Sequence, residues 1–268
     1  MTPLSVVIAA PRGMEEPPGA RAAFEAELDA GAGDELIVER GEQASVLVPV
    51  LWSRGIARSR GGVVALTLCS MTPDAGWRRA IFETMGDGLA GVGGAIEPAS
   101  RMRALDWAIH LCRYSAYLLP FEEGDAEDVA GDNAAYRREA IDAVRASWAD
   151  GFWETEVDAK LRRLGWRLRV TPRMVVRQGA SVSFLSFCRN RLLHGFRSGR
   201  ERAGRFTPAG RLARAVLWPA AAAVMLSRVG RRASSRGRSR GFRRAFLPLS
   251  VFLLLWTSGE AAGYLRGR

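Results

Sequence analysis

The chain has 268 residues, of which 48% are apolar and 25% are charged, and its formal net charge is +11. This composition excludes a wholly disordered chain, and the sequence contains no collagen or heptad period. Residues 186–268 hold 18 Arg and two acids, a balance of 18 − 2 = +16, so residues 1–185 carry 11 − 16 = −5. The sequence therefore describes a mildly acidic body followed by a strongly basic C-terminal region.

Cysteine and histidine are scarce, with three and two residues respectively. These numbers exclude a disulfide framework and a His-rich or Cys-rich metal centre. Residues 1–13 contain neither a basic n-region nor a long apolar h-region, so we expect no signal peptide there. The body is expected in the cytosol with reduced thiols.

The first hundred residues alternate short apolar runs with helical patterns. We expect strands at residues 4–9, 35–39, 44–51, 62–68 and 89–96, and helices at 18–28, 53–60 and from residue 75. Continuous apolar strands that alternate with helices predict an α/β fold, with a mostly parallel sheet covered by helices on both faces.

The pattern changes after residue 133. We expect helices at residues 134–148 and 152–164, short strands at 167–170 and 174–176, and an amphipathic Arg-bearing helix at 182–197. The α/β domain is expected to cover residues 1–185, and a basic helix or linker to cover residues 186–211.

Residues 212–268 have the composition of a membrane-associated region. Two apolar segments, 215–227 and 245–265, flank a stretch with eight Arg at 228–244. A spanning helix needs about 20 apolar residues, so only the second segment is long enough to cross. A loop with eight Arg should stay cytoplasmic, so we expect the first segment to lie in the interface or re-enter. The second either crosses once or lies in the interface; helices packed on the body or on a partner are the alternative.

Seven segments, in order over about 190 residues, resemble the GT-A glycosyltransferases of family 2. They are LSVVIAAPRG, DELIVERG, GIARSRGGVVALTL, MTPDAGW, VGGAIEP, GDNAAYRREAI and FWETEVDAKLRRLGWRL. The later segment SFCRNRLLHGFRSGRERAG resembles membrane-associated members, which often act on lipid-linked acceptors. The resemblance implies a GT-A fold and transfer of a sugar from a nucleotide-diphosphate donor.

The metal motif of that family is degenerate here. The resemblance places the metal-binding acids at Leu68, Cys69 and Ser70, none of which is a carboxylate. Magnesium needs oxygen ligands, usually carboxylates, and Asp74 is the nearest acid that could reach back. We therefore assign no metal ligand, and Mg²⁺ or Mn²⁺ stays open as a cofactor.

The nucleotide-sugar site is expected at the ends of the early strands. We expect it at Arg12, Glu39, Arg40, Arg58 and Ser70; the resemblance places Arg40 where the family has an acid, with Glu39 adjacent. In place of a metal, Arg guanidiniums can bind a diphosphate bidentately. The guanidiniums proposed for this role are those of Arg12, Arg58, Arg137 and Arg138, for which surface charge is the alternative.

The resemblance also implies a loop beside donor and acceptor, formed by Asp132, Asn133, Arg137 and Arg138. Asp132 and Asn133 could instead cap a following helix.

Glu154 is the expected catalytic base, since it matches the aspartate of the family's Glu-Asp pair and a base must reach the acceptor hydroxyl. A helix N-terminal acid that favours the macrodipole is the alternative. Asp158 lies one turn further on the same face. His194 is either structural or a contact to a phosphate at the membrane.

The sequence leaves two main functions open. One is a glycosyltransferase at the cytoplasmic face of the membrane, acting on a lipid or lipid-linked acceptor. The other is a catalytically inactive relative that serves as a binding partner, for example of an active glycosyltransferase. A nucleic-acid binder is disfavoured because no aromatic-basic RNA motif accompanies the Arg residues.

Overall fold

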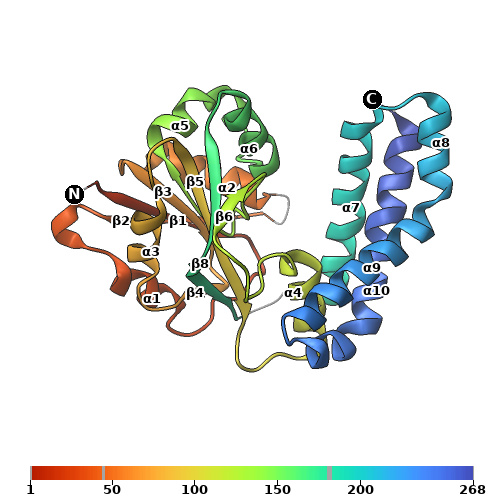
Figure 1. The fold of residues 1–268 in the computed structure, drawn as a ribbon, viewed down its shortest axis with the longest axis horizontal. Helices are drawn as coiled ribbons and strands as arrows, with labels where there is room; N and C mark the ends of the chain where they lie inside the picture. The colour runs from red at the N-terminus through yellow and green to blue at the C-terminus, as the bar shows by residue number, and fades with distance from the viewer. Residues whose placement is uncertain (1, 44–45, 180–182, 268) are drawn as a thin grey trace. The chain divides into compact units, whose positions relative to one another are not determined.

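The computed structural model describes residues 2–43, 46–179 and 183–267, and the chain divides into two compact units (Figure 1). Unit 1 contains Met1–Ala99 and Tyr117–Ala180, and unit 2 contains Ser100–Ala116 and Ser181–Arg268. Residues 100–116 therefore group with the C-terminal helices, although they lie far from them in the sequence.

Unit 1 is built on an eight-stranded sheet with the order β2-β1-β3-β7-β5-β8-β4, and β6 pairs with β8. β1 is parallel to β2 and β3, and β5 is parallel to β8, while β7 runs antiparallel between β3 and β5. The strands are β1 (Leu4–Ala10), β2 (Glu35–Arg40), β3 (Val63–Leu68), β4 (Met71–Pro73), β5 (Leu89–Pro98), β6 (Gly124–Ala126), β7 (Asn133–Arg137) and β8 (Arg167–Gln178).

Every residue of β1, β3 and β5 is buried. Successive side chains of a strand point to opposite faces, so both faces of the sheet are covered. The helices of unit 1 are α1 (Ala20–Glu27), α2 (Val48–Arg58), α3 (Trp77–Thr84), α5 (Arg138–Ala143) and α6 (Glu154–Arg163), with 3-10 turns at Ala30–Ala32 and Arg145–Ser147. The predicted α/β fold with a mostly parallel, covered sheet is confirmed.

Two predicted elements are wrong in type. Residues 46–51 are not a strand, because α2 begins at Val48 with Pro49 in its first turn, where a missing N–H costs nothing. Residues 44 and 45 of that prediction lie outside the described residues. The start of the helix predicted at 134–148 is instead strand β7, and helix α5 begins only at Arg138.

The two short strands predicted around Pro172 form one strand, β8. Its register against β5 shifts between Thr171, paired with Gly94, and Val175, paired with Ala95. Such a bulge places the extra residues outside the ladder, where Pro172, which lacks an N–H, is tolerated.

Unit 2 is helical in its described part. It contains α4 (Ala104–Tyr114), α7 (Phe184–Ala203), α8 (Pro208–Val216), α9 (Trp218–Ser235) and α10 (Ser239–Arg266), and α10 packs against the other four. The Arg-rich stretch at residues 228–244, expected as a loop, is mostly helical because α9 continues to Ser235 and α10 begins at Ser239. Arg is among the better helix formers, so its charge did not prevent the helix.

Glycines bring α7 and α10 into backbone contact within unit 2 (Figure 1). A Cβ on Gly195 or Gly199 of α7 would lie 2.1 Å from the carbonyl oxygen of Trp256 or Glu260. A Cβ on Gly259 or Gly263 of α10 would lie 2.2 or 2.3 Å from a carbonyl oxygen of α7. These four positions therefore have no room for any side chain.

Candidate functional site

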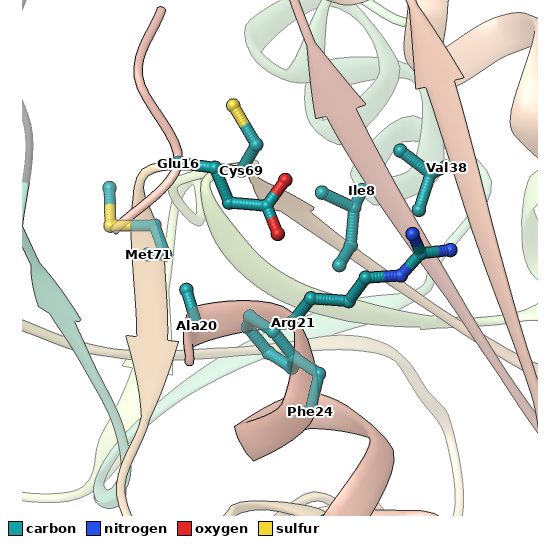
Figure 2. A pocket seen from close by; sticks show the side chains of 8 residues that line it. All are labelled: Ile8, Glu16, Ala20, Arg21, Phe24, Val38, Cys69 and Met71. Carbon is teal, nitrogen blue, oxygen red and sulfur yellow. The ribbon is translucent and has the colours of Figure 1, made fainter. Parts of the chain in front are cut away.

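A hollow lies at the edge of the sheet where the parallel strands β1, β2 and β3 end. In open α/β sheets this edge is where ligands bind. The hollow is narrow, without internal space for a water molecule, and is drawn in Figure 2. It is lined by Ile8, Glu16, Ala20, Arg21, Phe24, Val38, Cys69 and Met71.

Charged groups surround this mostly apolar hollow. Glu16 and Arg21 are part of its lining (Figure 2), and Arg40 at the end of β2 lies with its Nη2 3.9 Å from Oε2 of Glu16. Arg12, at the end of β1, donates a hydrogen bond of 3.3 Å to the carbonyl oxygen of Glu42. Arg21 in turn pairs with Glu25 at 3.2 Å, so three guanidiniums and two carboxylates lie at or beside this edge of the sheet.

Glu39 and Arg40 are adjacent on β2, so their side chains point to opposite faces of the sheet. Glu39 points toward α2, where its Oε1 accepts a 2.5 Å hydrogen bond from Nη1 of Arg58. Arg40 faces the other side, toward Glu16. Of the residues predicted for nucleotide binding, Arg40 thus lies beside the hollow and Arg12 lies at the same sheet edge, while Glu39 and Arg58 pair with each other on the α2 side.

Glu16 is a site residue that the sequence reasoning missed. The sequence did contain an indication of this residue, because two acids, Glu15 and Glu16, occupy the loop that follows β1, directly before Pro17. Only the fold brings this carboxylate opposite Arg40, which stands at the position where the resemblance places an acid.

The residues at the degenerate metal motif are poor metal ligands. Leu68, Cys69 and Ser70 are all buried, and the carbonyl oxygen of Ser70 accepts a 2.9 Å hydrogen bond from the Gly179 N–H. Burial, reinforced by the charge of Glu16, raises the pKa of the Cys69 thiol to about 11, so it is not a thiolate at neutral pH.

Asp74 does not reach back to this motif. Its two carboxylate oxygens each accept a 2.7 Å hydrogen bond from the guanidinium of Arg177. Within the described ranges, no group of three or more His, Cys, Asp or Glu side chains could hold a metal ion. The donor set at this edge therefore does not fit a divalent metal held by protein carboxylates.

Arg137 and Arg138 lie at the opposite edge of the sheet. β7 is antiparallel to β3, so Arg137 pairs with Val63 at the start of β3. Arg137 donates to the carbonyl oxygens of Leu89 and Gly86, both at 3.0 Å. Arg138 donates to those of Gly61 and Ile56, both at 3.2 Å, and burial lowers its pKa. Both side chains therefore donate to backbone carbonyl groups at this edge, away from the strand ends expected to bind a diphosphate.

Asp132 and Asn133 are at the expected edge. Thr67 of β3 donates a 3.0 Å hydrogen bond to the carbonyl oxygen of Asp132. The fully buried Asn133 amide donates to the carbonyl oxygens of Ala95 and Met174, both at 2.9 Å, and accepts from Trp77 Nε1, also at 2.9 Å. The alternative that these residues cap a helix is wrong, because Asn133 begins a strand.

Glu154 lies beside this loop, close to Gly131. Glu154 is the first residue of α6, and its carboxyl carbon lies 3.6 Å from where a Cβ on Gly131 would be. The ring of Trp52 would lie 2.7 Å from the same Cβ, so only glycine fits. The half-buried carboxylate therefore lies next to Asp132 at the carboxyl-end edge of the sheet, where the macrodipole of α6 favours its charge.

Asp158, one turn further along α6, is fully buried behind this loop. Its carboxyl group accepts hydrogen bonds from the Val129 N–H at 2.9 Å and the Tyr136 hydroxyl at 3.0 Å. Burial raises the pKa of Asp158 to about 8, and the charges of Glu154 and Asp128 add to the shift. At neutral pH this carboxyl group is protonated and adds no second charge beside Glu154.

Comparisons with known proteins gave remote likenesses only. No protein-family model and no curated protein matches the chain. A mannosyltransferase from Pyrobaculum calidifontis, solved with GDP-Man and Mn²⁺, is 12% identical with a TM-score of 0.44, over 91% of this chain and 86% of that one. GalNAc-T7, solved with UDP, GalNAc and Mn²⁺, is 14% identical with a TM-score of 0.41, over 66% of this chain and 43% of that one.

A mycobacterial protein is 17% identical with a TM-score of 0.41, over 72% of this chain and 73% of that one. At such identities and scores, these likenesses show no family membership.

Proposed function

We propose that this protein is a glycosyltransferase that takes a nucleotide-diphosphate sugar as donor. The observation that carries the proposal is the position of Glu154. A half-buried carboxylate lies beside the Asp132 loop at the same sheet edge as a hollow lined by Glu16 and Arg21, with Arg40 beside Glu16. The order of the seven motifs that resemble family 2 supports the same reading.

In the proposed reaction, a hydroxyl of the acceptor attacks the anomeric carbon of the donor sugar. Glu154 takes the hydroxyl proton as the new glycosidic bond forms, and the bond to the nucleoside diphosphate breaks. The leaving group departs with the electron pair of that bond. General-base assistance of this kind contributes about 10²–10⁴-fold to a rate.

The diphosphate needs positive charge where the family would use a metal. Arg12, Arg21 and Arg40 are the candidates, because Arg21 lines the hollow, Arg40 pairs with Glu16 of its lining and Arg12 follows β1 at the same sheet edge. A guanidinium can bind phosphate oxygens in pairs. Arg58, Arg137 and Arg138 leave the candidate list because Arg58 lies on the α2 side with Glu39, and the other two lie at the opposite edge of the sheet. We propose metal-independent binding of the donor on these grounds.

Unit 2 is proposed to hold the protein on the cytoplasmic face of the membrane. Of the 15 exposed large apolar residues recorded for the described chain, all but Leu47 and Leu164 lie in unit 2. One described helix, α10, is long and apolar enough to cross a membrane, and the pair α8–α9, bent by 63°, could count as a second.

We propose that α10 lies in the membrane interface and does not cross. α7 runs alongside the second half of α10, as the contacts of Gly195 with Trp256 and of Gly199 with Glu260 require. A crossing α10 would carry Arg residues of α7 into the bilayer, at about 2.5–3.5 kcal/mol for each one near its centre. These residues are Arg189, Arg191, Arg197, Arg200 and Arg202. The acceptor is then a lipid or a lipid-linked molecule reached from the cytoplasmic side.

One observation favours a second function, that of an inactive relative which binds a nucleotide sugar or partners an active glycosyltransferase. It is the lack of carboxylates at Leu68, Cys69 and Ser70, combined with their burial. Under this alternative the donor would still bind near Arg40, but no sugar would be transferred.

The test is nucleotide release from a panel of nucleotide sugars, with membrane extract as acceptor and with or without a chelator. We expect release that survives chelation and falls about a hundredfold or more in Glu154→Gln. The matched control is Glu156→Gln, an exposed acid on the same turn of α6, which should keep its activity. Donor binding without release, in extract that supports an active glycosyltransferase, would favour the inactive relative.

A further inference from the structure

A group of positively charged side chains on α4 and α7 has no role in the proposed transfer. The central member is Arg191, whose guanidinium carbon lies 4.9 Å from the ring centroid of Phe187 and 5.0 Å from that of Trp256. The Cys112 thiol of α4 also contacts it. Within the described residues, the Arg191 Nε is buried and has no hydrogen-bond partner.

His194 and Arg197 follow Arg191 at intervals of three residues on α7, so the three side chains share one side of the helix. Arg113 of α4 is close enough for its charge to act on Arg191 and His194, and its guanidinium carbon lies 4.9 Å from the centroid of the Tyr114 ring. The charges that act on His194 are those of Arg191, Arg113 and Arg197, all of them positive. Arg197 also pairs with Glu201, one turn further along α7, at 2.6 Å.

Burial and these three cations lower the pKa of His194 to about 4, so the imidazole is neutral at pH 7, and a bound anion would raise this pKa. Burial lowers the pKa of Arg191 as well, which means that part of its hydration has been lost. Partly desolvated like charges repel one another, and an anion bound among them would remove that repulsion.

We propose that Arg113, Arg191, His194 and Arg197 form a phosphate-binding site in unit 2. A phosphate group offers several acceptor oxygens to guanidinium donors, including the buried Nε of Arg191, and a dianion neutralises two of the positive charges. The site is assigned from unit 2 alone, so it does not depend on sugar transfer by unit 1.

The surroundings of the site bear on the source of the phosphate. Leu192 and Leu193 are exposed next to Arg191 on the same helix. A phosphate carried by a lipid could therefore bind while its acyl chains cover exposed leucines, whereas free phosphate would use the cations alone. The shared chemistry is the phosphate group, and the two sources are separated by experiment.

The two histidines make the site directly observable. In the full chain labelled with ¹³C histidine, NMR should show two imidazole signals, and His110→Gln assigns the other. We expect inorganic phosphate to raise the pKa of His194 by about one unit or more, because an adjacent anion favours the imidazolium. In a second arm, phosphatidylcholine vesicles containing phosphatidic acid replace the free phosphate, and vesicles with phosphatidylserine at equal charge control for general attraction.

The variants test the assignment of residues. Arg191→Gln should weaken phosphate binding about tenfold, the value of one charge-assisted hydrogen bond. Arg189→Gln is the matched control, an exposed Arg two positions away on the same helix, and should bind as before. If circular dichroism shows that Arg191→Gln does not fold, Arg113→Gln on α4 makes the same test.

A response to both free phosphate and phosphatidic acid supports the site with either source. A response to phosphatidic acid alone assigns it to lipid phosphate, and one to inorganic phosphate alone assigns it to soluble phosphate. An unchanged His194 pKa in both arms would overturn the proposal. So would an equal response to phosphatidylserine, or equal losses in Arg189→Gln and Arg191→Gln.

Discussion

Asp158 shows how a single residue can set the pH response of unit 1. It is fully buried, and the Tyr136 hydroxyl and the Val129 N–H both hydrogen-bond to its carboxyl group. Burial is the main cause that raises its pKa from 3.8 to about 8. In the unfolded chain the same group ionises near its ordinary pKa, so the folded state binds one more proton between about pH 4 and pH 8.

The stability of unit 1 should therefore decrease as the pH rises through that window, since the unfolded state then binds fewer protons than the folded state. Asp158→Asn removes the titration and keeps a polar group for Tyr136 and Val129. We expect its Tm to fall less than that of the wild type between about pH 5 and pH 8. Thermal unfolding at several pH values measures this, and a variant profile parallel to the wild type would contradict it. Asp150→Asn, at an exposed position, is the control.

Gly131 illustrates a residue whose role is visible only in the structure. Trp52 of α2 and Glu154 of α6 both lie close to the position that its Cβ would take. The sequence shows a glycine before Asp132 and Asn133, a pattern equally expected of a turn. The absence of a Cβ is what leaves room for the Trp52 ring against that loop, beside the carboxylate of Glu154.

At the scale of elements, the contact between α7 and α10 decides the form of unit 2. Gly195 and Gly199 face Gly259 and Gly263 across the contact, with carbonyl oxygens where their Cβ atoms would be. Small residues at four-residue spacing allow such close approach of two helix backbones. Leu and Phe side chains then pack around the contact, as in the pairing of Phe187 with Phe252 at 4.6 Å between ring centroids.

A branched side chain at this contact should force the helices apart. Gly259→Val would place its Cβ 2.2 Å from the Leu192 carbonyl oxygen, which backbone atoms cannot accommodate without moving. We expect a loss of about 3 kcal/mol of stability for unit 2, at the upper end of what overpacking costs.

The measurement is helix loss on heating, followed by circular dichroism of the full chain in detergent. Ala262→Val adds the same branched group at an exposed position of α10 and should leave the transition nearly unchanged. A Gly259→Val transition that coincides with that control would show that the close contact is not needed.

Strand β7 shows, also at the scale of elements, where the hydrophobic pattern of a segment fails to predict its secondary structure. Ala134, Ala135 and Tyr136 carry no alternation of apolar and polar residues, and the Ala pair favours a helix. The segment is a strand because it fills the gap between β3 and β5, where both neighbours offer unpaired backbone groups. Tertiary pairing overrides local propensity in such a buried position.

At the scale of the whole molecule, exposed apolar side chains are concentrated in one of the two units. Leu247, Val251 and Leu254 form one exposed line on α10, at intervals of three or four residues. Leu212, Val216 and Leu217 are exposed on and after α8. Exposed apolar surface of this extent, accompanied by many Arg, is typical of helices that lie on a membrane of anionic lipid.

Membrane binding should therefore depend on this line of residues. Leu247→Asp removes a side chain that is 76% exposed and adds a charge that anionic lipid repels. We expect about tenfold weaker binding to anionic vesicles, measured by co-sedimentation of the full chain. Leu164→Asp changes a residue of unit 1 that is 59% exposed and should bind as the wild type does. Equal losses in both variants would show that α10 has no special part in binding.

The sequence by itself determined the α/β class, the buried strands β1, β3 and β5, and the concentration of Arg in the C-terminal region. These properties follow from composition and from local runs of apolar residues, which are readable one segment at a time. The ordered motifs also singled out Glu154 and the Asp132 loop as neighbours in a candidate site.

Only the tertiary structure decided which charges stand together. The direction of β7 placed Arg137 and Arg138 at the far edge of the sheet, and the alternation of β2 turned Arg40 toward Glu16 and Glu39 toward Arg58. The packing of α7 and α4 on α10 likewise brought Arg191, His194 and Arg113 close enough for their charges to interact. Charge interactions depend on distance and burial, and neither is a property of a local segment, because both are set by elements far apart in the chain.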